Sequence, residues 1–214
     1  MVLRFLIRRN EEVLNYEMIP VPKREKHIIK YLDYEGVTDF IEEAGKHIRG
    51  CPEQSRLRNV AIVTLLYATG LRNGELCALN RDSIVNRSFT VVGKSKEPRI
   101  CFINEGAEKA INEYLMSRTD NNKALFISCR TENRITTGAL RKIFEIICHR
   151  SDFENIHPHT IRHSFATRML EKRVDIRFIG DLMGHADLNT TKMYTHYSNP
   201  QLRDIYNEAY SSNP

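Results

Sequence analysis

The sequence predicts a mainly α-helical domain with one small antiparallel β-sheet, an α+β fold, and three observations support this. Apolar residues recur at helical spacing in most segments after residue 33, as in 136–150. Two short runs rich in β-branched and aromatic residues, 88–93 and 99–103, flank a polar turn. With 214 residues, 41% of them hydrophobic and 28% charged, the chain is long enough for one generous core.

The N-terminal part is expected to hold an extension and two helices. Residues 1–33 form the extension and include the basic linker PVPKREK, whose prolines break regular structure. A first helix is expected over 35–46 and a second over 55–70, with Ser55 as its N-cap and Gly70 just after its end. The second helix contains NVAIVTLLYAT, which is apolar nearly all round and indicates a central place in the core.

The middle of the chain is expected to form the sheet and one helix. The runs 88–93 and 99–103 make an antiparallel hairpin, and a third short strand over 124–128 is expected to complete the sheet. Asn104 is expected to cap a helix that runs to about Ser117.

The sequence of the C-terminal part predicts five further helices. In the first, Thr136 is the cap and the helix runs through Arg150. The others are expected over 158–171, 175–183, 189–196 and 200–210.

Composition restricts the class of protein. The formal net charge of +5 and a pI near 9.0 favour polyanionic partners. No apolar run approaches the roughly 18 residues of a membrane span, and the N-terminal MVLRFLIRRN is too short for a signal-peptide core, so a cytoplasmic protein is expected. The five cysteines lack the spacing of a zinc site, which is typical of small apolar residues in a reducing compartment. They are Cys51, Cys77, Cys101, Cys129 and Cys148.

The segment ATGLRNGELCAL places an arginine directly after the buried helix. Arg72 follows Gly70 and Leu71, a junction that would hold its guanidinium group on rigid scaffold. Glu75 either orients this site or lies on a helix surface. The alternative for Arg72 is a solvated arginine at a helix end.

The segment HPHTIRHSFATRML places a histidine and an arginine on one side of a helix. His159 and Arg162 lie three residues apart and therefore share a face. A capping histidine and an exposed arginine are the simpler alternative. His163 lies four residues after His159, but the glutamate of a zinc-protease motif and any further ligand at suitable spacing are lacking, so no metal site is predicted.

The segment LMGHADLNTTKMYTHY joins a histidine to a tyrosine. His185 follows Gly184, and Tyr194 lies nine residues further on, with Thr191 between them. Most tyrosines simply pack an amphipathic helix, which is the alternative for Tyr194.

Together with the hairpin VVGKSKEPRICFI, these three segments resemble the tyrosine recombinases, also called the lambda-integrase family, and specifically its Xer-like and phage-integrase members. The resemblance runs from about residue 34 to residue 210. It implies a tyrosine recombinase catalytic domain of the DNA breaking-rejoining type over 34–214, with a C-terminal exchange helix at about 200–210.

The resemblance implies an enzyme for site-specific DNA recombination or DNA integration. In this family a DNA strand is cleaved to a covalent 3′-phosphotyrosyl intermediate with a free 5′-hydroxyl, and is then rejoined to another strand. Because the covalent bond stores the energy, neither ATP nor a metal nor another cofactor is implied. The implied partners are double-stranded DNA and further copies of the chain, which form a tetramer on paired sites through the C-terminal helix.

Cleavage of a phosphodiester by a side chain requires charge neutralisation, an activated nucleophile and an acid. Arginine suits the first task because its planar fork binds phosphate oxygens in pairs, and Arg72 and Arg162 are the candidates. The resemblance implies Tyr194 as the nucleophile, which needs help to ionise because tyrosine has a pKa of about 10. It also implies Glu75 as a carboxylate that orients the site.

Proton transfer falls to histidine and lysine in the resemblance. It implies that His159 assists the proton of the nucleophile and that His185 hydrogen-bonds a non-bridging oxygen. Lys94 would protonate the departing 5′ oxygen. The hairpin departs from the commoner GKGxKxR pattern, with Ser95 in place of glycine and Lys96 directly after it, so Lys96 is the alternative acid.

Two alternative hypotheses concern the function of the whole protein. A type IB topoisomerase uses the same nucleophile and arginines to nick and close strands, but the GHxxxxxTxxYTH match argues against it. A DNA-binding regulator that kept the fold and lost the chemistry is the second, although every catalytic position is intact. Integrases of this family usually carry a core-binding domain, and about 33 residues precede the catalytic region here. The chain is therefore either a catalytic fragment or a minimal member, and its target sequence and biological role stay open.

Overall fold

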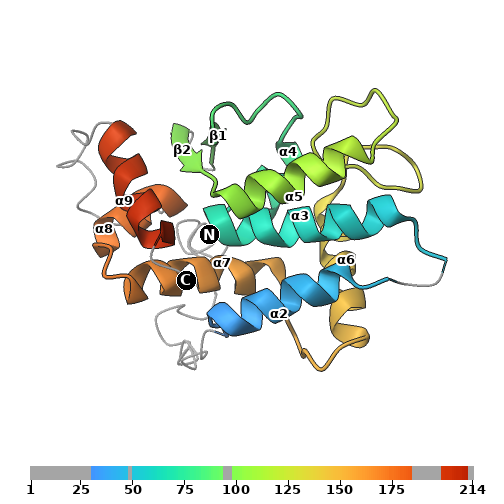
Figure 1. Ribbon diagram of the computed structural model, residues 1–214, viewed down its shortest axis with the longest axis horizontal. Helices are drawn as coiled ribbons and strands as arrows, with labels where there is room; N and C mark the ends of the chain where they lie inside the picture. The colour runs from blue at the N-terminus through green and yellow to red at the C-terminus, as the bar shows by residue number, and fades with distance from the viewer. Residues whose placement is uncertain (1–29, 48–49, 94–97, 185–198, 212–214) are drawn as a thin grey trace, which may run out of the picture.

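The structure, a computed structural model, describes residues 30–47, 50–93, 98–184 and 199–211 (Figure 1). Its first helix in chain order is α2 (Tyr34–Gly45), close to the expected 35–46. This helix begins after Asp33, whose side chain accepts a hydrogen bond from the Gly36 N–H at 2.8 Å.

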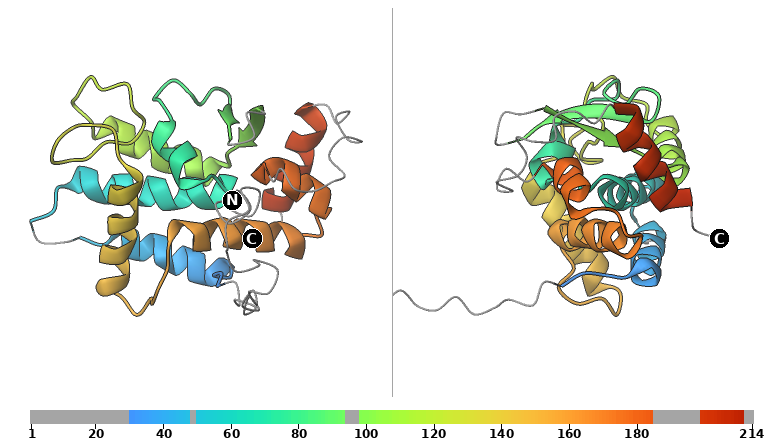
Figure 2. Two further views of the ribbon diagram at one scale, coloured as in Figure 1. Left: turned by 180° about the vertical axis from the view of Figure 1, so that it is seen from behind. Right: turned by 90° about the vertical axis from the view of Figure 1, so that its left-hand side faces the viewer.

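Helix α3 (Glu53–Thr69) lies at the centre of the fold, as its apolar sequence predicts. Its residues Leu65 and Leu66 are completely buried. Helices α2, α5 (Glu105–Met116) and α7 (Pro158–Glu171) pack against it. Seen nearly end on, α3 is surrounded by its neighbours (Figure 2). The core therefore forms around one buried helix rather than around a sheet.

The two ends of α3 differ in how well the sequence predicts them. The prediction that Ser55 caps the helix is wrong, because the helix already begins at Glu53, after Pro52 with its ring-fixed φ of −58°. At the other end Gly70 adopts the left-handed conformation, with φ 59°, as predicted. A Cβ on Gly70 would lie 2.6 Å from the Phe165 ring, so glycine is required here for both backbone and space.

The predicted hairpin is confirmed. Strands β1 (Ser88–Val92) and β2 (Pro98–Phe102) pair antiparallel, in a register that sets Ser88 opposite Phe102. Strand β2 contacts α3, α8 (Ile176–Met183) and α9 (Asn199–Ser211), so the hairpin is attached to the helices mainly through this strand.

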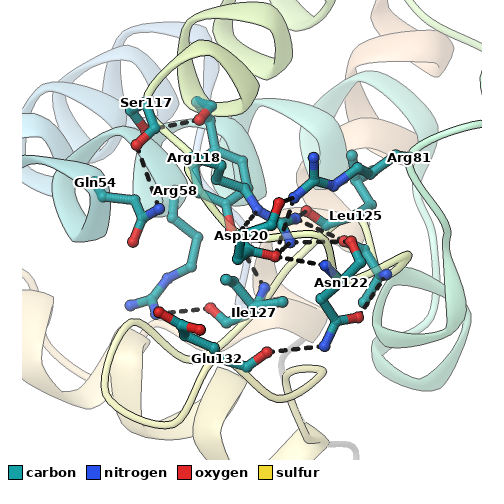
Figure 3. Close-up of polar contacts among 12 residues, drawn as sticks. Gln54, Arg58, Arg81, Ser117, Arg118, Asp120, Asn122, Leu125, Ile127 and Glu132 are labelled. Carbon is teal, nitrogen blue, oxygen red and sulfur yellow. Dashed lines mark hydrogen bonds and ion pairs between the residues drawn. The ribbon is translucent and has the colours of Figure 1, made fainter.

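The prediction of a third strand over 124–128 is wrong, since the described sheet has two strands. Its segment makes only isolated bridges and single backbone hydrogen bonds, and a buried guanidinium pairs two of its carbonyl groups in place of a neighbouring strand. Arg118 donates to the carbonyl groups of Ala124 and Leu125 at 2.6 and 2.8 Å, while its other nitrogens bind Asp120 (Figure 3). Backbone acceptors that are paired in this way do not need a strand partner.

Two other predicted helix caps are confirmed. The Asn104 side chain accepts from the Ala107 N–H at the start of α5, at 2.9 Å. The Thr136 hydroxyl accepts from the Ala139 N–H at the start of α6 (Thr137–His149), at 3.1 Å. The expected helix over 189–196 lies outside the described residues.

Helix α9 packs on its own domain in this chain. Tyr206 is buried and its hydroxyl donates to the Ala68 carbonyl at 2.9 Å, while the Tyr210 hydroxyl donates to the Tyr67 carbonyl at 2.8 Å. The guanidinium of Arg168 lies 5.1 Å from the centre of the Tyr210 ring. The apolar side of α9 therefore finds a partner surface within the same chain.

Two further observations bear on the class of protein. Within the described ranges, no helix is both long enough and apolar enough to cross a bilayer. Cys77 and Cys101 are buried, and burial raises the pKa of the Cys77 thiol to about 11 and that of Cys101 to about 12. These two thiols are therefore unreactive core residues, as the sequence predicts.

Candidate active site

Arg72 and Glu75 lie at the junction that follows α3. Arg72 is the N-cap of the short helix α4 (Asn73–Ala78). The Glu75 carboxylate accepts hydrogen bonds from the Arg72 backbone N–H at 2.7 Å and from its Nη1 at 3.1 Å. Only 8% of the Glu75 side chain is exposed, so it does not lie on a solvated helix surface. The carboxylate instead fixes the direction of the Arg72 guanidinium.

Sequence reasoning missed one residue of this site, Arg99 on strand β2. Its Nη1 and Nη2 donate to the two carboxylate oxygens of Glu75 at 2.8 and 2.7 Å, which makes a bidentate ion pair. No local pattern links Arg99 to Glu75, because the contact joins the hairpin to a helix. The one available signal was the final arginine of the GKGxKxR pattern, which the sequence keeps at Arg99.

The two arginines keep Glu75 ionised. Burial alone would raise the pKa of this carboxyl group, but the hydrogen bonds from Arg99 and Arg72 outweigh burial and hold the pKa at about 2. For Arg99, burial acts to lower the pKa, and the hydrogen bonds to Glu75 raise it overall. The pair is therefore fully charged at neutral pH.

Three arginines from three different elements meet three successive carbonyl groups at the end of α8. The pairs are Arg99 Nε with Leu182 at 2.9 Å, Arg162 Nη2 with Met183 at 2.8 Å, and Arg72 Nη2 with Gly184 at 2.7 Å. The last carbonyl groups of a helix lack partners within the helix and carry partial negative charge, so guanidinium groups are favourable there. We call Arg72, Arg99, Arg162 and Glu75 the arginine cluster.

Arg162 is the least compensated charge of the arginine cluster. The residue is 5% exposed, and its guanidinium donates to the carbonyl groups of Gly70 and Met183. Burial lowers its pKa to about 10, and the positive charges of Arg72 and Arg99 act in the same direction. Three guanidinium groups around one carboxylate produce a positive field that favours an anion.

His159 lies in the first turn of α7, one turn before Arg162, as the HxxR spacing predicts. Partial desolvation lowers the pKa of His159, and the charges of Arg162 and His163 lower it further. The imidazole is therefore largely neutral at pH 7 and able to accept a proton. His163 also has a lowered pKa, through desolvation and the charge of Arg162.

Four of the predicted site residues lie outside the described residues, namely Lys94, Lys96, His185 and Tyr194. Two glycines mark where their segments leave the described structure. A Cβ on Gly93 would lie 3.3 Å from Arg72 Nη1, and a Cβ on Gly184 would lie 3.0 Å from Arg99 Cδ. Both segments therefore start at the arginine cluster.

Comparison with known proteins identifies the family of this chain. Residues 30–200 match the Phage integrase family. Tyrosine recombinase XerC of Corynebacterium glutamicum is 34% identical over 88% of this chain, and the chain spans 61% of that relative. Tyrosine recombinase XerC of Haemophilus influenzae is 35% identical over 97% of the chain, which spans 70% of that protein.

Solved structures extend the comparison to the fold. The crystal structure of XerA recombinase superposes with a TM-score of 0.65 and 32% identity, covering 97% of this chain and 72% of that one. XerH site-specific recombinase, in a post-cleavage complex bound to palindromic difH substrate, gives a TM-score of 0.63 and 27% identity over 83% of this chain and 52% of that one. The predicted mainly helical fold with a small antiparallel sheet is confirmed. From its sequence match and its fold, this chain belongs to the phage integrase family.

Proposed function

We propose that this chain is the catalytic domain of a site-specific tyrosine recombinase that cleaves and rejoins DNA strands through a 3′-phosphotyrosyl intermediate. The observation that carries the proposal is the arginine cluster, a preorganised anion site from which the segments with Lys94 and Tyr194 both depart. The XerC relatives and the post-cleavage complex of XerH support the same reaction.

In this proposal Arg72 and Arg162 bind the non-bridging oxygens of the scissile phosphate. A guanidinium presents several N–H donors in a fixed plane, so each can keep a carbonyl contact and still bind a phosphate oxygen. Glu75 fixes Arg72 through two hydrogen bonds and stays ionised, which prevents the arginine from turning away. Stabilisation of developing negative charge by preorganised donors is the main catalytic contribution.

The proton steps complete the proposed reaction. The Tyr194 oxygen attacks phosphorus, its proton passes to the neutral imidazole of His159, and the bond from phosphorus to the 5′ oxygen breaks. Lys94, or Lys96 as the alternative, gives a proton to the leaving 5′ oxygen, while His185 hydrogen-bonds a non-bridging oxygen. Rejoining reverses these steps with a 5′-hydroxyl from another strand, so the reaction needs no ATP, metal or other cofactor.

The proposed partners are double-stranded DNA and further copies of the chain. We propose a tetramer on paired sites, in which α9 docks on a neighbouring protomer with the face it now packs on its own domain, through contacts such as that of Tyr206 with Ala68. Truncation after Asn199 should then weaken cooperative assembly on paired sites more than binding of one protomer to a half-site in gel-shift titrations. Equal loss of both complexes would assign α9 to the fold of its own domain alone.

The division of the chain is part of the proposal: residues 1–33 are an extension and 34–214 the catalytic domain. A DNA-binding regulator of the same fold would bind duplex DNA without forming a covalent adduct. A type IB topoisomerase would relax supercoils without exchanging strands between two sites.

The deciding experiment traps the covalent adduct on nicked duplex DNA in the presence of a chelator and without ATP. The wild-type chain should form the adduct, and Tyr194→Phe should form none while it still binds the duplex, since one hydroxyl contributes little to a phosphate-dominated interface. A persisting adduct in this variant would move the nucleophile elsewhere, first to Tyr197. No adduct with the wild-type chain would favour the regulator.

A further inference from the structure

Arg99 closes a ring of contacts that joins three distant parts of the chain. Its guanidinium binds both oxygens of Glu75, and Glu75 binds Arg72. Arg72 then reaches the Gly184 carbonyl, and Arg99 itself reaches the Leu182 carbonyl two residues earlier. The ring thus runs from strand β2 to the start of α4, on to the end of α8 and back to β2.

The environment of Arg99 is that of a fixed connector. Only 9% of its side chain is exposed, and three of its nitrogens are used, one on α8 and two on Glu75. Its aliphatic part lies against Gly184, where a Cβ would come within 3.0 Å of Arg99 Cδ. Gly184 adopts φ 63°, so the chain turns sharply at the point where Arg99 supports it.

The position of Arg99 in the sequence gives the ring a consequence. Arg99 lies on the hairpin that carries Lys94 and Lys96, and the α8 carbonyl that it binds is three residues before His185. A displacement of the hairpin therefore changes the hydrogen bonds that hold the end of α8. The same two hydrogen bonds to Glu75 connect that displacement to the direction of Arg72.

We propose that Arg99 is a positioning residue that couples the hairpin to the end of α8. Through this coupling it fixes the positions of the leaving-group acid and of the nucleophile segment relative to Arg72. This proposal rests on the proposed recombinase function. Only arginine fits the role, because it must serve one backbone carbonyl and both oxygens of a carboxylate from one planar group. Lysine keeps the charge but offers one nitrogen in place of three.

The test compares Arg99→Lys with a matched control, Arg118→Lys. Arg118 is also a buried arginine that binds a carboxylate and backbone carbonyl groups, but its partners, Asp120, Ala124 and Leu125, all lie in its own loop (Figure 3). Each variant is compared with the wild-type chain in thermal melting, in binding to a half-site duplex and in single-turnover cleavage of nicked DNA. Cleavage is measured at saturating protein and well below the melting temperature.

We expect Arg99→Lys to bind the half-site nearly as well as the wild-type chain and to cleave it about 10²-fold more slowly, the effect of a misplacement of about 1 Å. A second substrate carries a 5′-bridging phosphorothioate, whose sulfur leaves without a proton. Arg99→Lys should cleave it relatively better, with a higher ratio of phosphorothioate to normal rate than the wild-type chain, because the acid on the hairpin is displaced. Arg118→Lys should melt earlier but keep the wild-type rate and the wild-type ratio.

Three outcomes would overturn the role of Arg99: a wild-type cleavage rate in Arg99→Lys, a parallel loss of binding and cleavage, or an unchanged phosphorothioate ratio. Should Arg99→Lys fail to fold, Arg99→Gln, which keeps one amide donor for the Leu182 carbonyl, takes its place with the same expectations. If the wild-type chain forms no adduct, the recombinase proposal fails first. If the wild-type chain forms it and Arg99→Lys matches that rate, only the role of Arg99 fails.

Discussion

Two groups of arginines in this protein are built around one shared carboxylate, yet they serve different ends. In the first, which we call the loop cluster, Arg118 and Arg81 both bind Asp120, at 2.6 and 3.0 Å (Figure 3). The Arg118 side chain has no exposed surface, and its remaining hydrogen bonds go to the carbonyl groups of nearby residues such as Ala124. The loop cluster therefore stabilises the loop after α5 and joins it to Arg81 in the loop after α4.

The arginine cluster is also built around one shared carboxylate, but it carries more positive charge and joins more distant parts of the chain. Arg162 brings its formal charge to three arginines minus one carboxylate, +2, whereas the loop cluster has two minus one, +1. Its members come from the start of α4, from β2 and from α7, and the Arg72 side chain, at 30%, is about as exposed as that of Arg81, at 33%. The larger excess of positive charge, rather than a difference in exposure, suits the arginine cluster to an anionic substrate.

The largest effect on DNA cleavage should come from removing one of the positive charges of the arginine cluster. Arg72→Ala or Arg162→Ala should lower single-turnover DNA cleavage by about 10² to 10³, as the loss of one preorganised donor does in other enzymes. Arg81→Ala is the matched control, because the Arg81 side chain is 33% exposed and shares its carboxylate in the same way. A near-normal rate for either cluster variant would remove that arginine from the active site.

A second prediction removes an arginine from the loop cluster and expects a loss of stability without a loss of activity. Arg118→Ala should destabilise the protein by about 3 kcal/mol, because it leaves two buried carbonyl groups without their donor and removes one of the two arginines that bind the buried Asp120 carboxylate. Urea unfolding measures this loss. The fraction that stays folded should cleave DNA at the wild-type rate, and a slower rate in that fraction would show that the loop cluster also supports the site.

The smallest expected effect is on the loss of folding stability at acidic pH. Hydrogen bonds from Arg118 lower the pKa of Asp120 despite burial, while Arg99 and Arg72 overcome burial to hold that of Glu75 at about 2. A carboxyl group with a lowered folded pKa contributes stability that is complete above its unfolded pKa, about 4 for these residues, and is lost as pH falls toward the folded value.

Urea unfolding at pH 6 and pH 3 tests this expectation. Glu75→Gln and Asp120→Asn should each lose less stability between the two pH values than the wild-type chain does. An unchanged acid sensitivity in one variant would show that its carboxylate already has an ordinary pKa in the folded protein.

The sequence predicted best those features that depend on neighbours in the chain. The caps Asn104 and Thr136 and the left-handed Gly70 are set by side-chain and backbone contacts within a few residues, and all three are confirmed. The motif residues Arg72 and Arg162 both bind carbonyl groups at the end of α8, whereas their role in catalysis stays a prediction.

The features that the sequence missed depend on contacts across the fold. Arg99 reaches Glu75 only when the hairpin folds over α4, and no periodicity encodes this contact. The segment 124–128 has the composition of a strand, but Arg118 takes two of the backbone acceptors that a strand would offer, those of Ala124 and Leu125. In both cases the contact is made by a long arginine side chain, which the local pattern of residues does not predict.

The end of α8 gives the arginine cluster a second counterion, one made of backbone. Its three carbonyl groups carry part of the roughly half negative charge at the carboxyl end of a helix. Unlike Glu75, peptide groups do not titrate, so this share of the compensation is independent of pH as long as α8 stays folded. It is also too small to cancel the surplus of two positive charges, which leaves the unmatched remainder for a phosphate.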